Sequence, residues 1–265
     1  MKNLIRMMVT GLLGVTATML VVGGIAFARE QTLRVAMDAD PYPPFSFDGP
    51  NGKFSGFEVD LLEAYCAEMK VKCEIERIAW DGIIPALQAK KVDMIFNSMS
   101  ITEERKKAID FSNSYYYPTA VFVAAKTADY AMTPEGLQGK IVGAKAGTIY
   151  ANYVEQRLVP TGVEGKIYQN QDEVNSELAN GRIDVGIDLA MTMENFLKTP
   201  GAAELAIKGP LPADPLLGGG VGAGVRKGDT ALLAKINGAI DALAKNGQHK
   251  QIMEKYFTVD ISPRP

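Results

Sequence analysis

Histidine, tryptophan and cysteine are scarce in this sequence. The 265 residues include one histidine, His249, one tryptophan, Trp80, and two cysteines. A structural zinc site takes four closely placed His, Cys or carboxylate ligands, so this composition argues against a metal centre. We expect no metal and no cofactor. We interpret His249, which precedes Lys250 in a charged C-terminal segment, as a solvated surface residue.

The sequence also lacks an excess of basic residues. Lysine and arginine number 28, against 31 aspartate and glutamate residues, which gives a formal net charge of -3. Nucleic-acid binding requires a basic stripe, so we expect no nucleic-acid partner. The run Gly218-Gly219-Gly220 is not followed by the Lys-Ser/Thr pair of a phosphate-binding loop. We interpret it as flexible backbone where the chain crosses back between lobes.

One long apolar stretch is present, at the N-terminus. Lys2 and Arg6 begin it, and Ala26-Phe27-Ala28 at its end has the small-x-small pattern of a signal-peptidase site. These features predict a signal peptide at 1–28, cleaved after Ala28, and hence a periplasmic protein. An uncleaved membrane anchor is the alternative. The cleavage point carries no cysteine, which argues against a lipid anchor.

Cys66 and Cys73 both lie in the part of the chain that would be exported. In an oxidising compartment a disulfide is the default interpretation, with two buried thiols or half a metal site as alternatives. A loop this short would stabilise the fold by about 2.5 kcal/mol if the bond acts on chain entropy. The bond would join a helix end to the strand that follows it.

Cleavage would leave about 237 residues (265 minus 28), which suits two lobes. Strand and helix patterns alternate along the chain, and this alternation predicts an α/β fold. We expect strands at 33–37, 73–78, 92–96, 122–125 and 141–144, and helices at 59–69 and 230–245, the last stopped by Gly247.

Two segments resemble each other without a gap, Asp81 to Asn97 and Asp172 to Asp188. Each is interpreted as an Asp-capped helix followed by a strand. If the match is not a chance similarity, the chain has two lobes of related build. Asn97 and Asp188 would then lie at equivalent strand ends, where open α/β sheets bind ligands.

Polar residues follow the first of these strands. Ser100 or Thr102 would begin a helix, and Arg105 in its first turns can pair bidentately with a carboxylate. Taken alone, this pattern also fits a capped helix with a surface arginine. Residues 141–148 have the same pattern of a strand, a glycine turn and the start of a helix. Two helix N-termini could therefore hold one carboxylate. Asp188 could balance an ammonium.

At this point the sequence resembles the polar amino-acid-binding proteins of bacterial ABC importers, a cluster of periplasmic solute-binding proteins. The Cys66 and Cys73 spacing is similar to that of the lysine/arginine/ornithine, histidine and opine receptors. The resemblance rests on Pro43-Pro44-Phe45, Gly56 to Leu61, Trp80 to Leu87, Met99 to Arg105, Phe111-Ser112, Gly147-Thr148, Gly181 to Asp184 and Val225-Arg226-Lys227.

The resemblance implies a type II periplasmic-binding-protein fold with two lobes, a discontinuous lobe 1 and two hinge crossings. Lobe 1 would take 32–119 and 215–265, and lobe 2 would take 120–214. Such a protein is expected to be a monomer that captures an amino acid and delivers it to a membrane permease, without catalysis. A cyclohexadienyl dehydratase-like enzyme on the same fold is the main alternative, and a sensor is another.

The resemblance also implies which residues bind the α-amino and α-carboxylate groups of the ligand. Arg105 and the backbone N–H groups of Ser100 and Ile149 would hold the α-carboxylate, with help from Thr148. The α-ammonium would be held by the hydroxyls of Ser98 and Ser100 and by Asp188.

For the ligand side chain, the resemblance implies a sandwich between Tyr42 and Trp80. Asp38 or Asp40 would read a distal positive charge, which favours a basic amino acid: arginine, lysine, ornithine or histidine. Lys145 departs from the basic-amino-acid receptors, which carry an apolar residue there. A lysine would repel a cation and suit an amide such as glutamine, or the second carboxylate of an opine.

Overall fold

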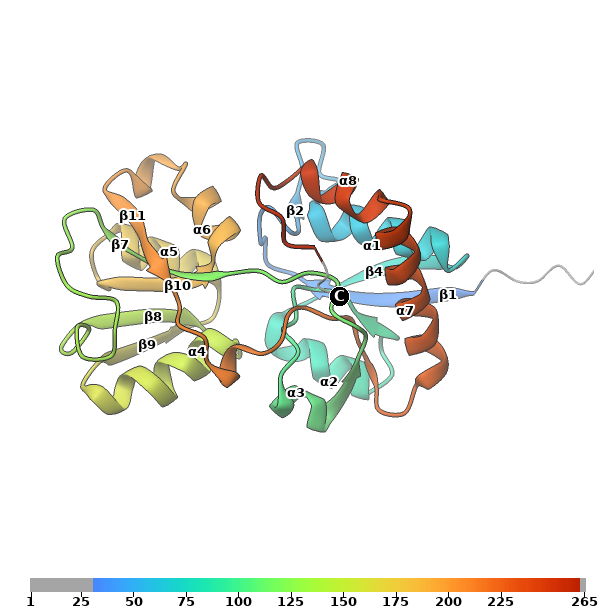
Figure 1. The fold of residues 1–265 in the computed structure, drawn as a ribbon, viewed down its shortest axis with the longest axis horizontal. Coiled ribbons are helices and arrows are strands. Elements are labelled where there is room, and N and C mark those ends of the chain that lie inside the picture. Colours follow the sequence, from blue (N-terminus) through green and yellow to red (C-terminus); the bar gives the residue numbers. More distant parts are fainter. Residues whose placement is uncertain (1–30, 263–265) are drawn as a thin grey trace, which may run out of the picture.

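The computed structural model describes residues 31–262. The predicted signal peptide and its cleavage site lie outside these residues. Within the described part, no helix is long and apolar enough to cross a membrane. The described chain forms two bodies, each built around one five-stranded sheet (Figure 1).

The first sheet, in the body we name lobe 1, has the strand order β4-β1-β5-β12-β6. Its strands are β1 (Thr32–Asp38), β4 (Lys72–Ile78), β5 (Met94–Ile95), β6 (Ile109–Phe111) and β12 (Gly224–Arg226). Strand β1 is parallel to both neighbours, whereas β12 is antiparallel to β5 and β6. The helices of this lobe are α1 (Phe57–Glu68), α2 (Ile83–Gln88), α3 (Glu103–Ala108), α7 (Thr230–Lys245) and α8 (Gln248–Glu254). A small hairpin pairs β2 (Phe47–Asp48) with β3 (Phe54–Ser55).

The second sheet, in lobe 2, has the order β11-β7-β10-β8-β9. Its strands are β7 (Ala120–Ala125), β8 (Ile141–Lys145), β9 (Glu164–Tyr168), β10 (Val185–Leu189) and β11 (Leu205–Pro210). Its helices are α4 (Ile149–Tyr153), the π-helical turn Val154–Leu158, α5 (Gln171–Ala179) and α6 (Ala190–Phe196). Both sheets mix parallel and antiparallel pairs, and the predicted two-lobe α/β fold is confirmed.

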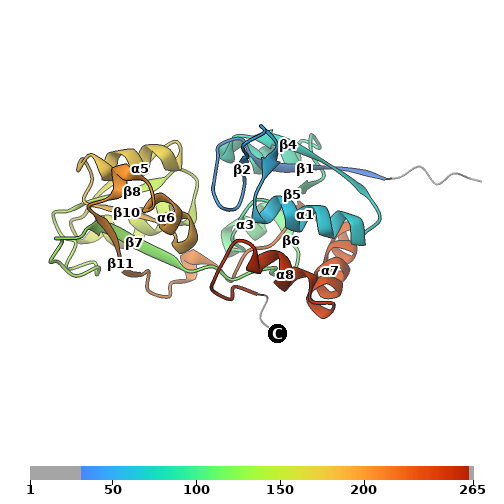
Figure 2. The same cartoon turned by 90° about the horizontal axis from the view of Figure 1, so that it is seen from above.

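The chain passes between the sheets twice, once between β6 and β7 and once between β11 and β12. Figures 1 and 2 show these two segments joining the bodies. The lobe limits at 119/120 and 214/215 remain a prediction. Tyr115 and Tyr116 precede the first crossing and are fully buried. Their rings stack on Phe96 and Phe45, at centroid distances of 4.5 and 5.7 Å, so they pack the base of the hinge.

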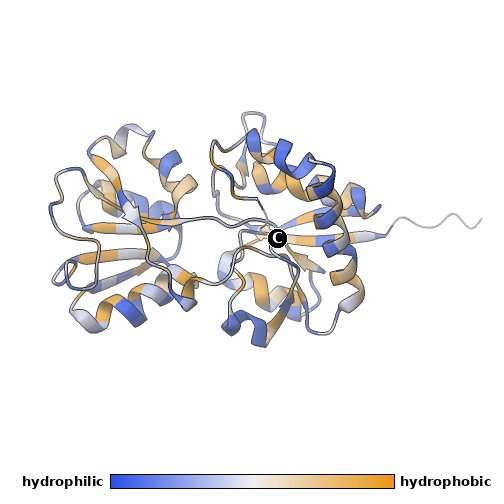
Figure 3. Cartoon of the chain, in the orientation of Figure 1, coloured by the Kyte–Doolittle hydropathy of each residue, from blue (hydrophilic) through white to orange (hydrophobic). Residues whose placement is uncertain are grey.

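Apolar residues concentrate on the strands and on the helix faces turned toward them (Figure 3). His249 belongs to this core, so the prediction of a solvated His249 is wrong. The residue is 1% exposed and lies against the rings of Tyr65 and Phe57. On helix α8 it shares one face with Ile252 and Met253, at the i, i+3, i+4 spacing of a buried stripe, whereas Lys250 points outward.

The predicted disulfide is confirmed. Cys66 in α1 and Cys73 in β4 are bonded, with their Cα atoms 6.1 Å apart. The bond therefore links the end of a helix to the start of the next strand. It fixes the outer strand β4, which pairs with β1 along its whole length.

The two similar segments both form a helix followed by a strand, α2 with β5 and α5 with β10. The predicted Asp caps are wrong. Asp81 lies in a single 3-10 turn before α2, and the cap of α2 is Gly82, without a side-chain hydrogen bond. Asn170 caps α5 by accepting from Glu173 N, because its backbone is extended, whereas Asp172 is already inside the first turn.

Candidate ligand-binding site

A cavity of about 480 Å³, counting its open mouth, lies where strand ends of the two lobes face each other. Strands β1 and β8 end at Asp38 and Lys145, and β10 carries Asp188. The ten predicted site residues all line this cavity: Asp38, Tyr42, Trp80, Ser98, Ser100, Arg105, Lys145, Thr148, Ile149 and Asp188. The other lining residues are Asn97, Tyr150, Gln171 and Leu189.

Arg105 is held in the first turn of α3. Thr102 caps this helix by accepting from Arg105 N at 3.2 Å. The guanidinium donates to two carbonyl oxygens, Ser100 O at 3.0 Å and Gly147 O at 3.3 Å. It also lies 5.3 Å from the centre of the Trp80 ring. Burial lowers the pKa of Arg105 to about 10, which leaves it charged at neutral pH.

Arg105 makes no salt bridge with any carboxylate in residues 31–262. Its partners are neutral carbonyls from both lobes, since Gly147 follows β8. A desolvated cation without an acid partner is suited to binding an anion.

The loop from β8 to α4 closes onto Trp80. Trp80 Nε1 donates to Gly147 O at 3.0 Å. Gly147 has φ of +68°, and a Cβ there would approach the Trp80 ring to 3.3 Å, so both the turn and the contact favour glycine. Thr148 then caps α4, accepting from Ala151 N at 3.1 Å and donating to Lys145 O at 2.6 Å.

Asp188 lies almost fully buried on the lobe 2 side of the cavity. Its Oδ1 accepts from the Tyr42 hydroxyl at 2.5 Å and from Leu189 N at 2.6 Å. Burial raises the pKa of Asp188 to about 6, although these donors and the nearby Lys145 ammonium oppose the rise. An additional positive charge beside this carboxylate would therefore be strongly favoured.

Ser98 faces the cavity in the left-handed region, with φ of +46°. Its N–H donates to both carboxylate oxygens of Glu58 at 2.7 Å. Glu58 also accepts from the hydroxyls of Tyr115 and Tyr116, at 2.8 and 3.0 Å. The Tyr116 hydroxyl lies 2.8 Å from Ser98 Oγ. Glu58 thus fixes the backbone that presents Ser98.

Glu58 is fully buried, and burial raises its pKa while its hydrogen bonds act in the opposite direction. Sequence reasoning did not assign it a role. A signal was present, because an acid sits there inside an otherwise apolar helix start, Phe57–Val59.

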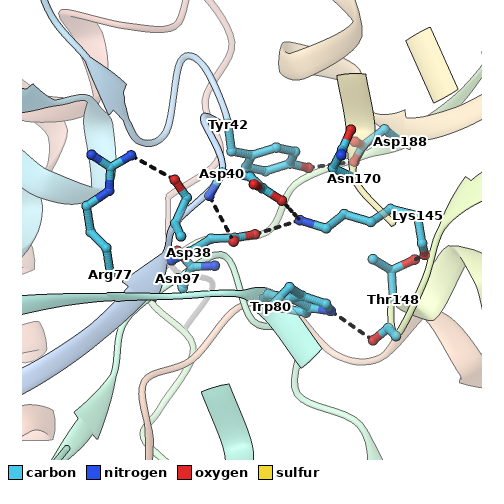
Figure 4. A network of polar contacts seen from close by, with 12 residues as sticks. Asp38, Asp40, Tyr42, Arg77, Trp80, Asn97, Lys145, Thr148, Asn170 and Asp188 are labelled. Carbon is cyan, nitrogen blue, oxygen red and sulfur yellow. Dashed lines mark hydrogen bonds and ion pairs between the residues drawn. The ribbon is translucent and has the colours of Figure 1, made fainter. Parts of the chain in front are cut away.

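Asp38, Asp40 and Lys145, which we name the acid-lysine cluster, lie together beside Tyr42 and Trp80, and Asp38 and Lys145 line the cavity (Figure 4). Lys145 Nζ donates to Asp38 Oδ2 at 2.6 Å and lies 3.7 Å from Asp40 Oδ2. Asp38 Oδ1 accepts from Asp40 N at 3.1 Å, and Asp38 N donates to Asn97 Oδ1 at 2.8 Å. Asp38 and Lys145 are buried, whereas the Asp40 side chain is 46% exposed and is not among the residues that line the cavity.

Two aromatic rings flank this cluster. In Figure 4 the rings of Tyr42 and Trp80 lie on opposite sides of the Lys145 ammonium. Lys145 Nζ is 5.9 Å from the Trp80 ring centre. The arrangement suits a flat or extended cation, since ring faces and carboxylates both attract positive charge.

No group of three or more His, Cys, Asp and Glu side chains in the described part of the chain could hold a metal ion. The cavity therefore offers fixed charges, hydrogen-bonding groups and two aromatic faces. Such a site is suited to binding a small zwitterion.

The chain belongs to the bacterial extracellular solute-binding proteins, family 3, which match it over residues 33–259. The homologues are binding proteins and not enzymes, and they include the lysine/arginine/ornithine, histidine and octopine receptors.

Among curated relatives, an L-arginine-binding protein of Pseudomonas aeruginosa is 43% identical over 89% of this chain and 91% of its own length. A lysine/arginine/ornithine-binding periplasmic protein of Escherichia coli is 36% identical over 88% of this chain and 90% of its own. Among solved structures, an ancestral arginine-binding protein bound to arginine matches with a TM-score of 0.79 and 37% identity. That match covers 86% of this chain and 99% of the other.

Proposed function

We propose that this protein captures a basic amino acid, with arginine first, between its two lobes in the periplasm and delivers it to the membrane permease of an ABC importer. The family membership supports extracellular solute binding. The N-terminal sequence pattern supports export. The arginine- and lysine-binding relatives support an amino-acid ligand.

The head group of an α-amino acid fits two charged residues of the cavity, Arg105 and Asp188. Arg105 would bind the α-carboxylate, with the backbone N–H groups of Ser100 and Ile149. The Thr148 hydroxyl already donates to Lys145 O, so it would assist by holding the start of α4 in place. Asp188 would bind the α-ammonium, with the hydroxyls of Ser98 and Ser100. The carboxylate would pair with a guanidinium that has no acid partner in the described part of the chain, and the ammonium would pair with a carboxylate whose buried charge it would stabilise.

The observation that carries the choice of a basic ligand is the charge balance of the acid-lysine cluster. The cluster contains two carboxylates and one ammonium within salt-bridge distance of each other. Once the head group has neutralised Arg105 and Asp188, the side-chain end keeps one net negative charge. A guanidinium or ammonium would balance that charge, whereas a neutral amide would leave it uncompensated.

An opine or glutamine-type ligand is the alternative, and Lys145 favours it. The Lys145 ammonium could donate to an amide oxygen or to a second carboxylate. An opine that carries both a guanidinium and an extra carboxylate could pair with the acids of the cluster and with Lys145 at the same time.

Calorimetry on the mature protein tests the proposal, with arginine, lysine, ornithine, histidine, glutamine and octopine as ligands. We expect arginine to bind most tightly and glutamine at least tenfold more weakly. Tight binding of glutamine or octopine, with no binding of the four basic amino acids, would overturn it. The Arg105→Ala variant serves as a control, since it should weaken every ligand that has an α-carboxylate.

A further inference from the structure

Lys145 joins the two lobes through a buried ion pair. It is the last residue of β8 in lobe 2, and it contacts Asp38, the last residue of β1 in lobe 1. Its side chain is 9% exposed and that of Asp38 is 4% exposed. Removing one partner of such a buried ion pair is costly, because the other charge then stays desolvated and unpaired.

The surroundings of the Lys145 ammonium are those that a ligand cation would need. It has a carboxylate at 2.6 Å and an aromatic ring at 5.9 Å, with the Tyr42 ring on its other side. The Lys145 ammonium is thus paired with Asp38, the buried acid of the cavity that would otherwise bind the distal positive charge of a ligand. A basic ligand and Lys145 therefore compete for Asp38.

Asp40 offers the lysine a second position. Its Oδ2 is 3.7 Å from Lys145 Nζ, and its side chain is half exposed and lies outside the cavity lining. The lysine side chain has four flexible carbon–carbon links and a compact charge, so its ammonium can move by a few ångströms without moving the backbone. A shift from Asp38 to Asp40 would keep the lysine paired while it vacates the buried acid.

We propose that Lys145 is a built-in occupant of the subsite for the ligand's distal cation, and that a basic ligand binds by displacing it from Asp38 onto Asp40. This inference rests on the proposed function and makes Lys145 and Asp40 residues that determine specificity. A ligand with a neutral tail leaves the Lys145–Asp38 pair in place. The pair therefore lowers the affinity for cationic ligands, and it reduces the difference in affinity between basic and neutral ligands.

The test is a double-mutant cycle with Lys145→Met and Asp40→Asn, measured by calorimetry with arginine and with glutamine. Methionine keeps most of the length of the side chain and removes its charge. We expect Lys145→Met to tighten arginine binding about tenfold or more, since Asp38 then lacks a competing partner. Glutamine binding should stay the same or weaken.

Asp40→Asn should weaken arginine binding about threefold to tenfold in the presence of Lys145, because the displaced ammonium loses its acceptor. In the Lys145→Met background the same change should have less than a threefold effect. An equal loss in both backgrounds would show that Asp40 binds the ligand independently of Lys145, and the displacement would be wrong. A Lys145→Met variant that binds arginine no better than the wild type would also show that the displacement is wrong.

Lys166→Met is the matched control, because Lys166 lies on the neighbouring strand β9 outside the cavity lining, and it should change neither affinity. Denaturant unfolding of each variant confirms that it is folded. If wild-type protein fails to bind arginine but Lys145→Met gains binding, Lys145 occupies the cation subsite but is not displaced by the ligand, so the displacement and the proposed ligand are both wrong. If neither binds arginine, both proposals fail.

Discussion

Lowering the pH from 7.5 to 5 should weaken amino-acid binding about tenfold, and Asp188 is the reason. Burial raises its pKa to about 6, so its carboxylate is ionised at pH 7.5 and about one in eleven molecules keeps the charge at pH 5. Under the proposed function only the ionised form pairs with the ligand ammonium. The affinity therefore follows the ionised fraction, and it falls as the pH drops through 6.

The same carboxylate should destabilise the protein at neutral pH. A folded-state pKa above the ordinary 3.8 means that the folded chain holds the proton more tightly than the unfolded chain. The stability that this residue contributes is therefore lost as the pH rises from 4 to 6. The difference between 6 and 3.8, at 1.36 kcal/mol per pH unit, is about 3 kcal/mol. Asp188→Asn should stabilise the ligand-free protein at pH 7.5 by up to that amount while it weakens binding.

Calorimetry between pH 5 and 7.5, in buffers of different ionisation enthalpy, measures both the affinity and the protons released. Near pH 6 the wild type should release about half a proton on binding, since half of the Asp188 carboxyls are protonated there. Tyr42→Phe removes a donor that favours the ionised form, so it should move the midpoint to higher pH. The reasoning is refuted if the wild-type affinity is flat across this range. It is also refuted if Asp188→Asn keeps the wild-type profile, which would point to another group such as His249.

Two further predictions concern the anchor and the disulfide. Arg105→Ala should weaken ligand binding by about 2–4 kcal/mol in calorimetry, as truncation of one side of a buried charge pair does, and it should barely change the stability of the ligand-free protein. The exposed Arg182→Ala is its control, and a loss of less than threefold would contradict the assignment. Replacing both Cys66 and Cys73 by alanine should lower the free energy of unfolding by about 2.5 kcal/mol in denaturant titrations. Two alkylatable thiols in freshly purified periplasmic protein would show that the bond does not form there.

Features that depend on nearby residues, or on positions that the resemblance supplied, were predictable from the sequence. Helix α7 spans Thr230–Lys245, as predicted, because its apolar spacing and Gly247 are both local signals. All ten predicted site residues line one cavity, because ligand sites of α/β sheets gather at strand ends and the resemblance supplied the matching positions. The Asp caps failed because each helix begins one or two positions away from the predicted start: α5 is capped by the extended Asn170, and α2 follows a 3-10 turn that contains Asp81.

Features that depend on distant partners were not predictable. His249 was assigned to the surface from its charged neighbours, yet its burial follows from the position of α8 against Tyr65 and Phe57. Glu58 received no role, because its partners Ser98, Tyr115 and Tyr116 are 40 to 58 positions away in the sequence. A buried acid is identified by the donors around it, and those donors converge only in the folded chain.

The ligand-side-chain end of the cavity illustrates the same limit. From the sequence, Asp38 and Asp40 argued for a cationic ligand and Lys145 argued against one, as if the three charges acted separately. The structure pairs Lys145 with Asp38 across 107 positions of sequence, so these two charges largely cancel and Asp40 keeps the surplus. Lysine at this position therefore does not exclude a basic ligand. Under the proposed displacement, Lys145 lowers the affinity for a basic ligand because the ligand must compete with it for Asp38. Asp40 reduces this loss, because it can accept the displaced ammonium.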